Sequence, residues 1–239
     1  MDGRVATNVG YRAAFDRLFA RGSEAVLAGS HYRDTPPVAG GRWGVSVVFR
    51  PDPGCVERLA ALTDEALTLA GPGHWPTGAP QSVHVTVRAM EAHRPHVTAD
   101  DPLVRRCAAA LHRTAAACGP VRFHFRGLTL TPSGVMLCAY PTDSAADRVA
   151  GRLAHELGGD AWFEAEFHRD IWYATLVHFT GVVADPAGLV DWVASRRDLD
   201  LGVSDIDGME LTRFTYNGLQ PVRSTLARAH LDGVHPSRE

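Results

Sequence analysis

The chain has 239 residues, of which 45% are hydrophobic and 21% charged, and its formal net charge is −3. It contains no lysine, so all 24 basic residues are arginine. This composition is typical of a soluble globular protein with a substantial core, and it excludes a protein whose surface is basic enough to coat nucleic acid.

The first part of the chain is predicted to alternate helices and strands. Residues 8–28 carry an apolar stripe at helical spacing, and a loop rich in chain-breaking residues follows at 29–41. Residues 43–49 alternate apolar and small side chains, which predicts a strand, and residues 56–70 predict a second helix. A further strand is predicted at 82–88.

The rest of the chain continues the mixture and adds a hairpin. Two segments joined by Pro132-Ser133 alternate in polarity and are predicted to pair as antiparallel strands. Asp-Pro pairs mark the starts of two helices, because the carboxylate and the proline both favour the first turn. The elements expected here are a helix at 102–118, strands at 121–131 and 134–140, a helix after Thr142-Asp143, a strand at 171–183, a helix at 186–192 and a strand at 209–216.

The cysteines and the apolar runs indicate where the protein resides. The four cysteines are scattered without a metal-ligand spacing, which favours reduced thiols and a cytoplasmic location; they are Cys55, Cys107, Cys118 and Cys138. The first residues contain no apolar signal region, and no apolar run reaches 18 residues. We therefore expect neither an export signal nor a membrane span.

Two of the predicted strands carry the same triplet, His84-Val85-Thr86 and His178-Phe179-Thr180. In a strand, side chains at positions i and i+2 project from the same face, so each triplet presents an imidazole beside a hydroxyl. Histidine is suited to acid and base roles because its ordinary pKa is near 6.5. Two such strands brought together would surround one small anion, which favours phosphoryl chemistry.

A triplet of this kind also arises by chance, and a third copy is present at His96-Val97-Thr98. That copy precedes Asp100-Asp101-Pro102, where Thr98 suits the start of a helix, so we interpret His96 as a loop residue. The other two copies are flanked by alternating apolar side chains, which is the context of a strand.

With these flanks, the chain resembles the 2H phosphoesterase superfamily, which includes the 2′-5′ RNA ligase-like proteins and cyclic phosphodiesterases. His84-Val85-Thr86-Val87 fits the family motif, whereas His178-Phe179-Thr180-Gly181 departs from it at the last position. The resemblance implies an α+β fold with two pseudo-symmetric lobes, whose largely antiparallel sheets line a central groove with helices outside. It divides the chain into an N-terminal helical extension, residues 1–42, and one bilobal domain, residues 43–239.

The resemblance also implies the roles of individual residues. His84 and His178 would be the acid–base pair for a 2′,3′-cyclic phosphate or a 2′-5′ phosphodiester, without a metal or another cofactor. Thr86 and Thr180 would bind the phosphate oxygens. Independently of the resemblance, Arg88 is expected on the same strand face as His84 and Thr86, and this makes it a candidate for a further phosphate contact.

A competing second motif is Tyr173-Ala174-Thr175-Leu176, in which tyrosine replaces the histidine. If this alignment is correct, Tyr173 faces the phosphate and the site has lost one imidazole. We favour His178, because that alignment needs no substitution.

Two other functions stay open at this point. The same scaffold could bind an RNA end or a nucleotide without turnover, or it could perform acid–base chemistry on a small molecule without phosphate. The expected partner is an RNA end or a small molecule containing phosphate, and not a membrane. The sequence leaves the oligomeric state open.

Overall fold

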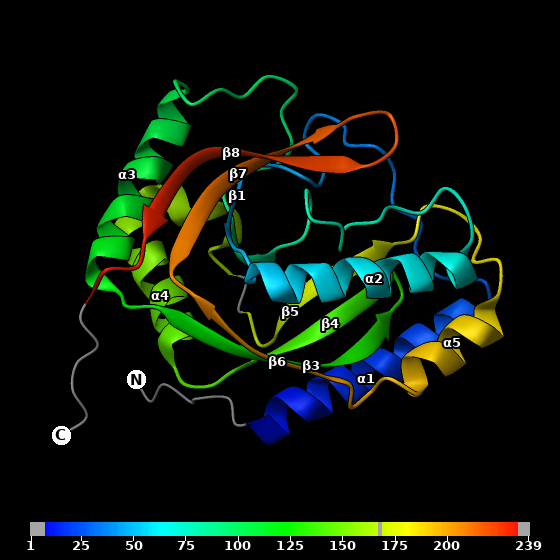
Figure 1. The fold of residues 1–239 in the computed structure, drawn as a ribbon. Coiled ribbons are helices and arrows are strands. Elements are labelled where there is room, and N and C mark those ends of the chain that lie inside the picture. The colour runs from blue at the N-terminus through cyan, green and yellow to red at the C-terminus, as the bar shows by residue number, and fades with distance from the viewer. Residues whose placement is uncertain (1–7, 167–168, 234–239) are drawn as a thin grey trace.

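The computed structural model describes residues 8–166 and 169–233, which form a mixed α+β fold as predicted (Figure 1). The helices are α1 (Asn8–Leu27), α2 (Pro53–Ala70), α3 (Pro102–Ala117), α4 (Ala145–Leu157) and α5 (Pro186–Ala194), with a 3-10 helix η1 (Gly158–Glu164). The strands are β1 (Ser46–Phe49), β2 (Val85–Ala89), β3 (Val121–Thr131), β4 (Gly134–Pro141), β5 (Trp172–His178), β6 (Asp200–Ile206), β7 (Gly208–Tyr216) and β8 (Pro221–His230).

The strands form one eight-stranded sheet in the order β6-β3-β4-β5-β2-β1-β7-β8, with antiparallel pairing between the neighbours. The order divides the sheet into two halves of four strands, and β5 and β2 join them in the middle. These halves correspond to the two lobes that the sequence predicted. The junction is narrow, because Val85 and Ala174 are the register pair between β2 and β5.

Helices cover both halves of the sheet. α1 and α5 lie side by side against β3, and α3 lies against β7 and β8 with α4 packed on it (Figure 1). Three of the helices begin with an Asp-Pro pair, in which the carboxylate accepts a backbone hydrogen bond from the first turn. The capping residues are Asp52, Asp101 and Asp185.

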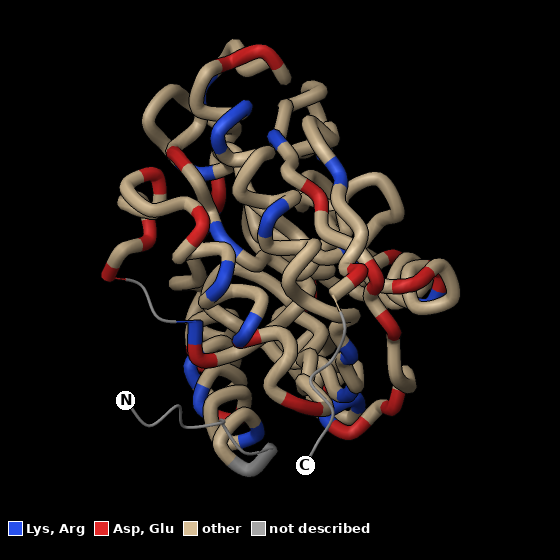
Figure 2. Tube along the Cα trace, turned by 90° about the vertical axis from the view of Figure 1, so that its left-hand side faces the viewer, with Lys and Arg blue, Asp and Glu red and all other residues tan. Residues whose placement is uncertain are grey.

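The core follows from the alternation within the strands. Phe49, Phe123 and Trp172 are buried and contact one another with tilted rings, and the Trp172 indole N–H donates to Asp147 of α4. Among the described residues, no helix is long and apolar enough to cross a membrane. Arginine and acidic positions are interspersed along the trace (Figure 2), as expected from the nearly balanced charge.

The structure differs from the sequence prediction at several strands. β1 begins at Ser46 and β2 covers Val85–Ala89, whereas the prediction placed these strands at 43–49 and 82–88, so His84 immediately precedes β2. β6 and β8 were not predicted, because Asp200 to Ile206 contains three aspartate or serine positions and Pro221 to His230 carries three polar or charged residues in succession. β5 ends at His178, whereas the prediction extended the strand to residue 183. The division at residue 42 stays a prediction, although α1 is bound to the sheet by the Thr129 hydroxyl, which donates to the Phe15 carbonyl at 3.0 Å.

Candidate active site

The central junction of the sheet brings two triplets face to face. Val85 pairs with Ala174 in antiparallel register. In such a pair the residues on either side are also opposite each other, so His84-Val85-Thr86 lies across from Tyr173-Ala174-Thr175. The segment that stands opposite the first motif is therefore the one with tyrosine in the place of histidine.

A β-bulge nevertheless brings His178 to the same face. Val135 and Met136 are neighbours in β4, and they pair with Val177 and Thr175 of β5. Leu176, between these two, has no partner in β4 and is therefore an extra residue in β5. An extra residue shifts the alternation by one position. His178 consequently projects on the side of Tyr173 and Thr175, three residues after Thr175.

A second bulge moves Arg88 away from the first motif. Val47 and Val48 are neighbours in β1, and they pair with Arg88 and Thr86 of β2. Val87, between these two, is therefore the extra residue in β2. Arg88 therefore lies on the opposite face from Thr86, and its guanidinium donates to the Ala161 carbonyl at 2.7 Å. The expectation that Arg88 shares a face with His84 and Thr86 is wrong for this reason.

Thr180 lies beyond the end of β5 and does not line the same cavity as His84. Its hydroxyl donates to the Gly73 carbonyl at 2.6 Å, and its backbone N–H donates to Nδ1 of His74 at 3.1 Å. These contacts hold the chain after β5 against the loop that follows α2.

The cavity on this face of the sheet has a volume of about 450 Å³. Four of the residues predicted for the site line it, namely His84, Thr86, Tyr173 and His178. The sequence analysis missed other lining residues, and these include Arg42, Trp43, Ser46, Glu91, Arg169 and Phe214. Because they come from separate strands and loops, no local sequence pattern connects them with the histidine triplets.

His84 is held in one tautomer. Its Nδ1 lies 2.7 Å from the Ser82 carbonyl, which can only accept, so Nδ1 carries the hydrogen and Nε2 keeps a free lone pair. Burial lowers the pKa of His84 to about 4, with smaller contributions from the positive charges of Arg223 and Arg50. The ring also contacts Phe214, at 5.1 Å between centroids. His84 is thus a neutral base at pH 7.

His178 is more deeply buried, with 7% of its surface exposed. Its Nδ1 lies 2.9 Å from the Thr77 hydroxyl, and the Trp43 ring stands edge-on at 4.8 Å between centroids. Burial lowers the pKa of His178 to about 3, and the positive charges of Arg42 and His84 act in the same direction. Both imidazoles line the same cavity.

Trp43 forms a wall of this cavity in a strained conformation. Its φ of 70° lies in the left-handed region, which a bulky side chain rarely adopts. Its indole nitrogen is buried and has no hydrogen-bond partner among the described residues. The ring is wedged against His178, Trp75 and Phe214, and this packing holds the strained backbone in place.

Two arginines that line the cavity are paired with carboxylates. Arg42 pairs with Asp34 at 3.2 Å, and Arg169 pairs with Glu164 at 3.4 Å. In the part of the chain that the structure describes, no three His, Cys, Asp or Glu side chains gather in an arrangement that could hold a metal ion. The cavity offers two imidazoles and the hydroxyls of Ser46, Thr86, Thr175 and Tyr173, which are groups suited to a phosphate. Its two guanidiniums are each paired with a carboxylate, and Glu91 and Glu164 also line it.

Comparison with known proteins gives matches only at the level of structure. No protein-family model and no curated protein matches the sequence. The structure of TT0787 from Thermus thermophilus superposes with a TM-score of 0.58 at 20% identity, covering 80% of this chain and 100% of that one. E. coli LigT complexed with 3′-AMP gives 0.57 at 10% identity, with 80% and 98% covered. LigT complexed with ATP gives 0.54 at 11%, with 79% and 98% covered. At these identities the likeness shows the fold.

Proposed function

From the 2H phosphoesterase fold, which this chain has, we propose that the protein is a phosphoesterase with His84 and His178 as its acid–base pair. Its substrate is a 2′,3′-cyclic phosphate or a 2′-5′ phosphodiester, in RNA or a small nucleotide. The E. coli LigT structures with 3′-AMP and ATP support a nucleotide as the ligand class.

The observation that carries the proposal is the pair of buried, neutral imidazoles on one face of the sheet junction. His84 presents a free Nε2 because its Nδ1 hydrogen is bound to the Ser82 carbonyl. His178 comes from the adjacent strand and lines the same cavity. General acid–base catalysis needs two such groups on opposite sides of the reacting phosphorus.

In the proposed reaction, Nε2 of His84 removes a proton from water as the water oxygen attacks phosphorus. His178 protonates the ribose oxygen as the P–O bond breaks, and a ribose phosphomonoester results. The hydroxyls of Thr86 and Thr175 donate to the non-bridging oxygens, on which negative charge develops. Thr86 and Thr175 have these hydroxyls available, because no hydrogen bond engages either side chain among the described residues.

We expect His178, the proposed acid, to take up its proton when the substrate binds. Both histidines are neutral in the free protein at pH 7, since burial holds their pKa values far below 6.5. A phosphate anion between them favours the charged imidazolium and raises both pKa values. Substrate binding is therefore coupled to the uptake of a proton.

The first experiment is hydrolysis of nucleoside 2′,3′-cyclic phosphates with EDTA present. We compare wild type with His84→Ala, His178→Ala and Tyr173→Phe. Removal of a general base or acid costs about 100-fold or more, so both alanine variants should lose at least that much of kcat. Tyr173→Phe should retain activity within about tenfold.

The same set of variants tests the competing motif. A large loss in His84→Ala and Tyr173→Phe, with His178→Ala active, would assign the second position to Tyr173, which stands opposite the first triplet. Full activity of His84→Ala would overturn the proposal in either form.

A nucleotide-binding module without turnover is the second candidate. The observation that favours it is the tyrosine opposite the first motif, where a symmetric site would have its second imidazole. Binding of adenosine 2′-monophosphate by a wild-type protein that hydrolyses none of the phosphodiesters would support this function instead.

A further inference from the structure

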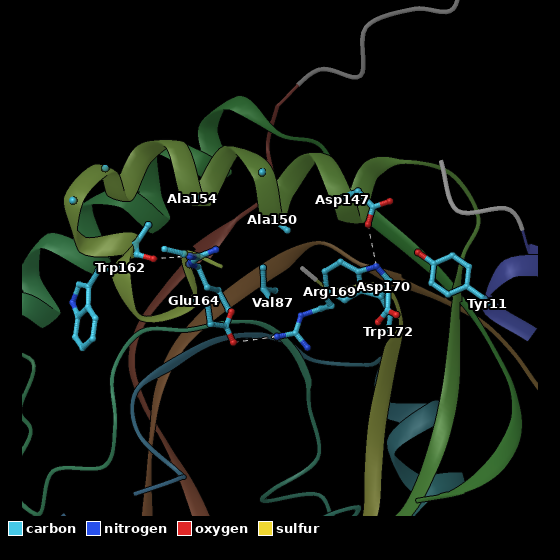
Figure 3. A pocket seen from close by; sticks show the side chains of 16 residues that line it. Tyr11, Val87, Asp147, Ala150, Ala154, Trp162, Glu164, Arg169, Asp170 and Trp172 are labelled. Atoms are coloured by element: carbon cyan, nitrogen blue, oxygen red, sulfur yellow. Dashed lines mark hydrogen bonds and ion pairs between the residues drawn. The ribbon is translucent and has the colours of Figure 1, made fainter. Parts of the chain in front are cut away.

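A second and larger cavity, of about 760 Å³, lies on the other face of the sheet junction. It is bounded by α4 and η1 on one side and by the ends of β2 and β5 on the other (Figure 3). Its volume is within the range of pockets that hold small organic ligands, and is several times what a phosphate group needs. None of the residues proposed for catalysis lines it.

Two sides of this cavity are apolar, and the side formed by α4 carries small residues. Ala150 and Ala154 project from α4 above Val87, and Trp172 closes the floor beside it (Figure 3). Gly151 also lines the cavity, and a Cβ built on it would meet no atom within 4 Å. A glycine inside a helix costs about 1 kcal/mol relative to alanine, so its lack of a side chain leaves space beside α4 at the expense of stability.

An aromatic side chain stands at the rim. Trp162 of η1 lines the cavity and is 62% exposed, which is unusual for so large an apolar ring. Its neighbour Phe163 contacts it edge-on at 5.5 Å and lines the histidine cavity instead. One turn of η1 thus places an aromatic ring beside each cavity, and such rings are stacking platforms for unpaired bases.

The polar groups of the cavity favour hydrogen-bond donors over an anion. Asp147, Glu164 and Asp170 offer carboxylate oxygens, and Figure 3 shows all three around the cavity. The two cations are already engaged, since Arg88 donates to the Ala161 carbonyl and Arg169 pairs with Glu164. Asp147 accepts from the Trp172 indole N–H at 3.2 Å, so Asp147 and Glu164 each use one oxygen and keep a second oxygen as an acceptor. A phosphate would meet more negative than positive charge here, whereas ring N–H and amino groups would find acceptors.

The two cavities adjoin, because Glu164 and Arg169 line both of them. On the premise of the proposed function, we infer that the larger cavity binds the base of the nucleotide whose phosphate lies between His84 and His178. The base stacks on Trp162 and presents its N–H groups to the carboxylates, while the ribose passes Glu164 and Arg169.

Three probes test this by calorimetric titration: inorganic phosphate, adenosine, and adenosine 2′-monophosphate. The ratio of the phosphate Kd to the nucleotide Kd measures what the base contributes. Gly151→Leu fills the cavity without removing a contact, and Trp162→Ala removes the platform. In each variant we expect nucleotide and adenosine to bind at least tenfold more weakly, with phosphate binding unchanged within twofold.

His155→Leu is the matched control, because His155 is an exposed position of α4 that does not line the cavity. It should bind all three probes like wild type. Thermal melting of each variant checks that the fold is intact, and Ala154→Leu replaces Gly151→Leu if that variant does not fold.

The outcomes separate this inference from the proposed function. The inference would be overturned if Gly151→Leu and Trp162→Ala both bound the nucleotide and adenosine as tightly as wild type. It would also be overturned if wild type bound neither the nucleotide nor adenosine. A different outcome would support the base site and overturn the proposed function. In that outcome the wild type binds adenosine and the cavity variants do not, but the wild type neither binds phosphate nor hydrolyses phosphodiesters.

Discussion

At the scale of single residues, the environment of each imidazole decides its chemistry. The carbonyl of Ser82 fixes the Nδ1 hydrogen of His84, and burial keeps the ring neutral. His178 has a hydroxyl at Nδ1 that can donate or accept, so its tautomer can change during a reaction cycle. Of the two, His84 is the better defined base, and His178 is the proposed acid.

This assignment predicts how KM depends on pH. If His178 must take up a proton when substrate binds, KM for a 2′,3′-cyclic phosphate should rise about tenfold per pH unit between pH 5 and 7, because the free pKa is about 3. The value of kcat should change little over this range. The measurement is steady-state kinetics at constant ionic strength.

The substrate itself keeps one charge throughout this range and adds no slope. A KM that stays constant between pH 5 and 7 would show that a group other than a histidine supplies the proton, and Tyr173 is the nearest candidate in the opposite strand.

At the scale of elements, two bulges arrange the site. The extra residue Leu176 turns His178 toward the histidine cavity, and the extra residue Val87 turns Arg88 away from it. Both bulges lie in the strands that meet at the centre of the sheet. Bulges commonly re-aim a side chain next to an active site.

The close pairing of β4 with β5 beside the bulge gives a prediction. A Cβ on Gly134 would overlap the Val177 carbonyl oxygen, so Gly134→Ala must push the two strands apart. We expect it to lower the free energy of unfolding by about 1–3 kcal/mol, as overpacking usually does, and to reduce kcat by displacing His178. Urea unfolding and cyclic phosphate hydrolysis measure the two effects.

Gly151→Ala is the control, since the added Cβ meets open space on a helix and should stabilise the protein by about 1 kcal/mol. Equal stability of the two variants would show that β4 and β5 can separate without cost.

At the scale of the whole molecule, both halves of the sheet contribute to one buried polar centre. The first triplet belongs to the half that contains β1, β7 and β8, and His178 belongs to the half that contains β3, β4 and β6. Folding therefore buries two imidazoles at the junction, and each must stay neutral there.

Stability should consequently fall as the pH is lowered. The pKa of each histidine is depressed in the folded state, to about 4 for His84 and about 3 for His178, and is about 6.5 when unfolded. Between these values the unfolded chain binds more protons, so acid favours unfolding. Each histidine contributes up to about 1.4 kcal/mol per pH unit, from pH 6.5 down to its folded pKa and no further.

Urea unfolding between pH 7 and 4.5 measures this dependence. His178→Asn should reduce the slope by about one proton relative to wild type, because the carboxylates that also respond to acid are the same in both proteins. The exposed His155→Asn is the control. An equal slope in His178→Asn and wild type would contradict the burial of a neutral imidazole at residue 178.

The sequence by itself determined the features that depend on neighbouring residues. The Asp-Pro pairs predicted the starts of two helices, the alternation predicted the hairpin of β3 and β4, and the HxT spacing predicted that His84 and Thr86 share a face. The likeness to known structures confirmed the fold that the motif implied. β6 and β8 escaped prediction because their polar residues hide the apolar alternation, and their pairing with β3 and β7 supplies the stability instead.

Only the tertiary structure decided which side chains meet. Whether a strand contains an extra residue depends on the register of its partner strand, which here lies across an intervening helix in the sequence, as Val48 does from Thr86 and Met136 from Thr175. The bulges at Val87 and Leu176 therefore left no local signal. They separated Arg88 from Thr86, brought His178 beside Thr175 and left Thr180 outside the cavity, because a shift of one residue exchanges the two faces of a strand.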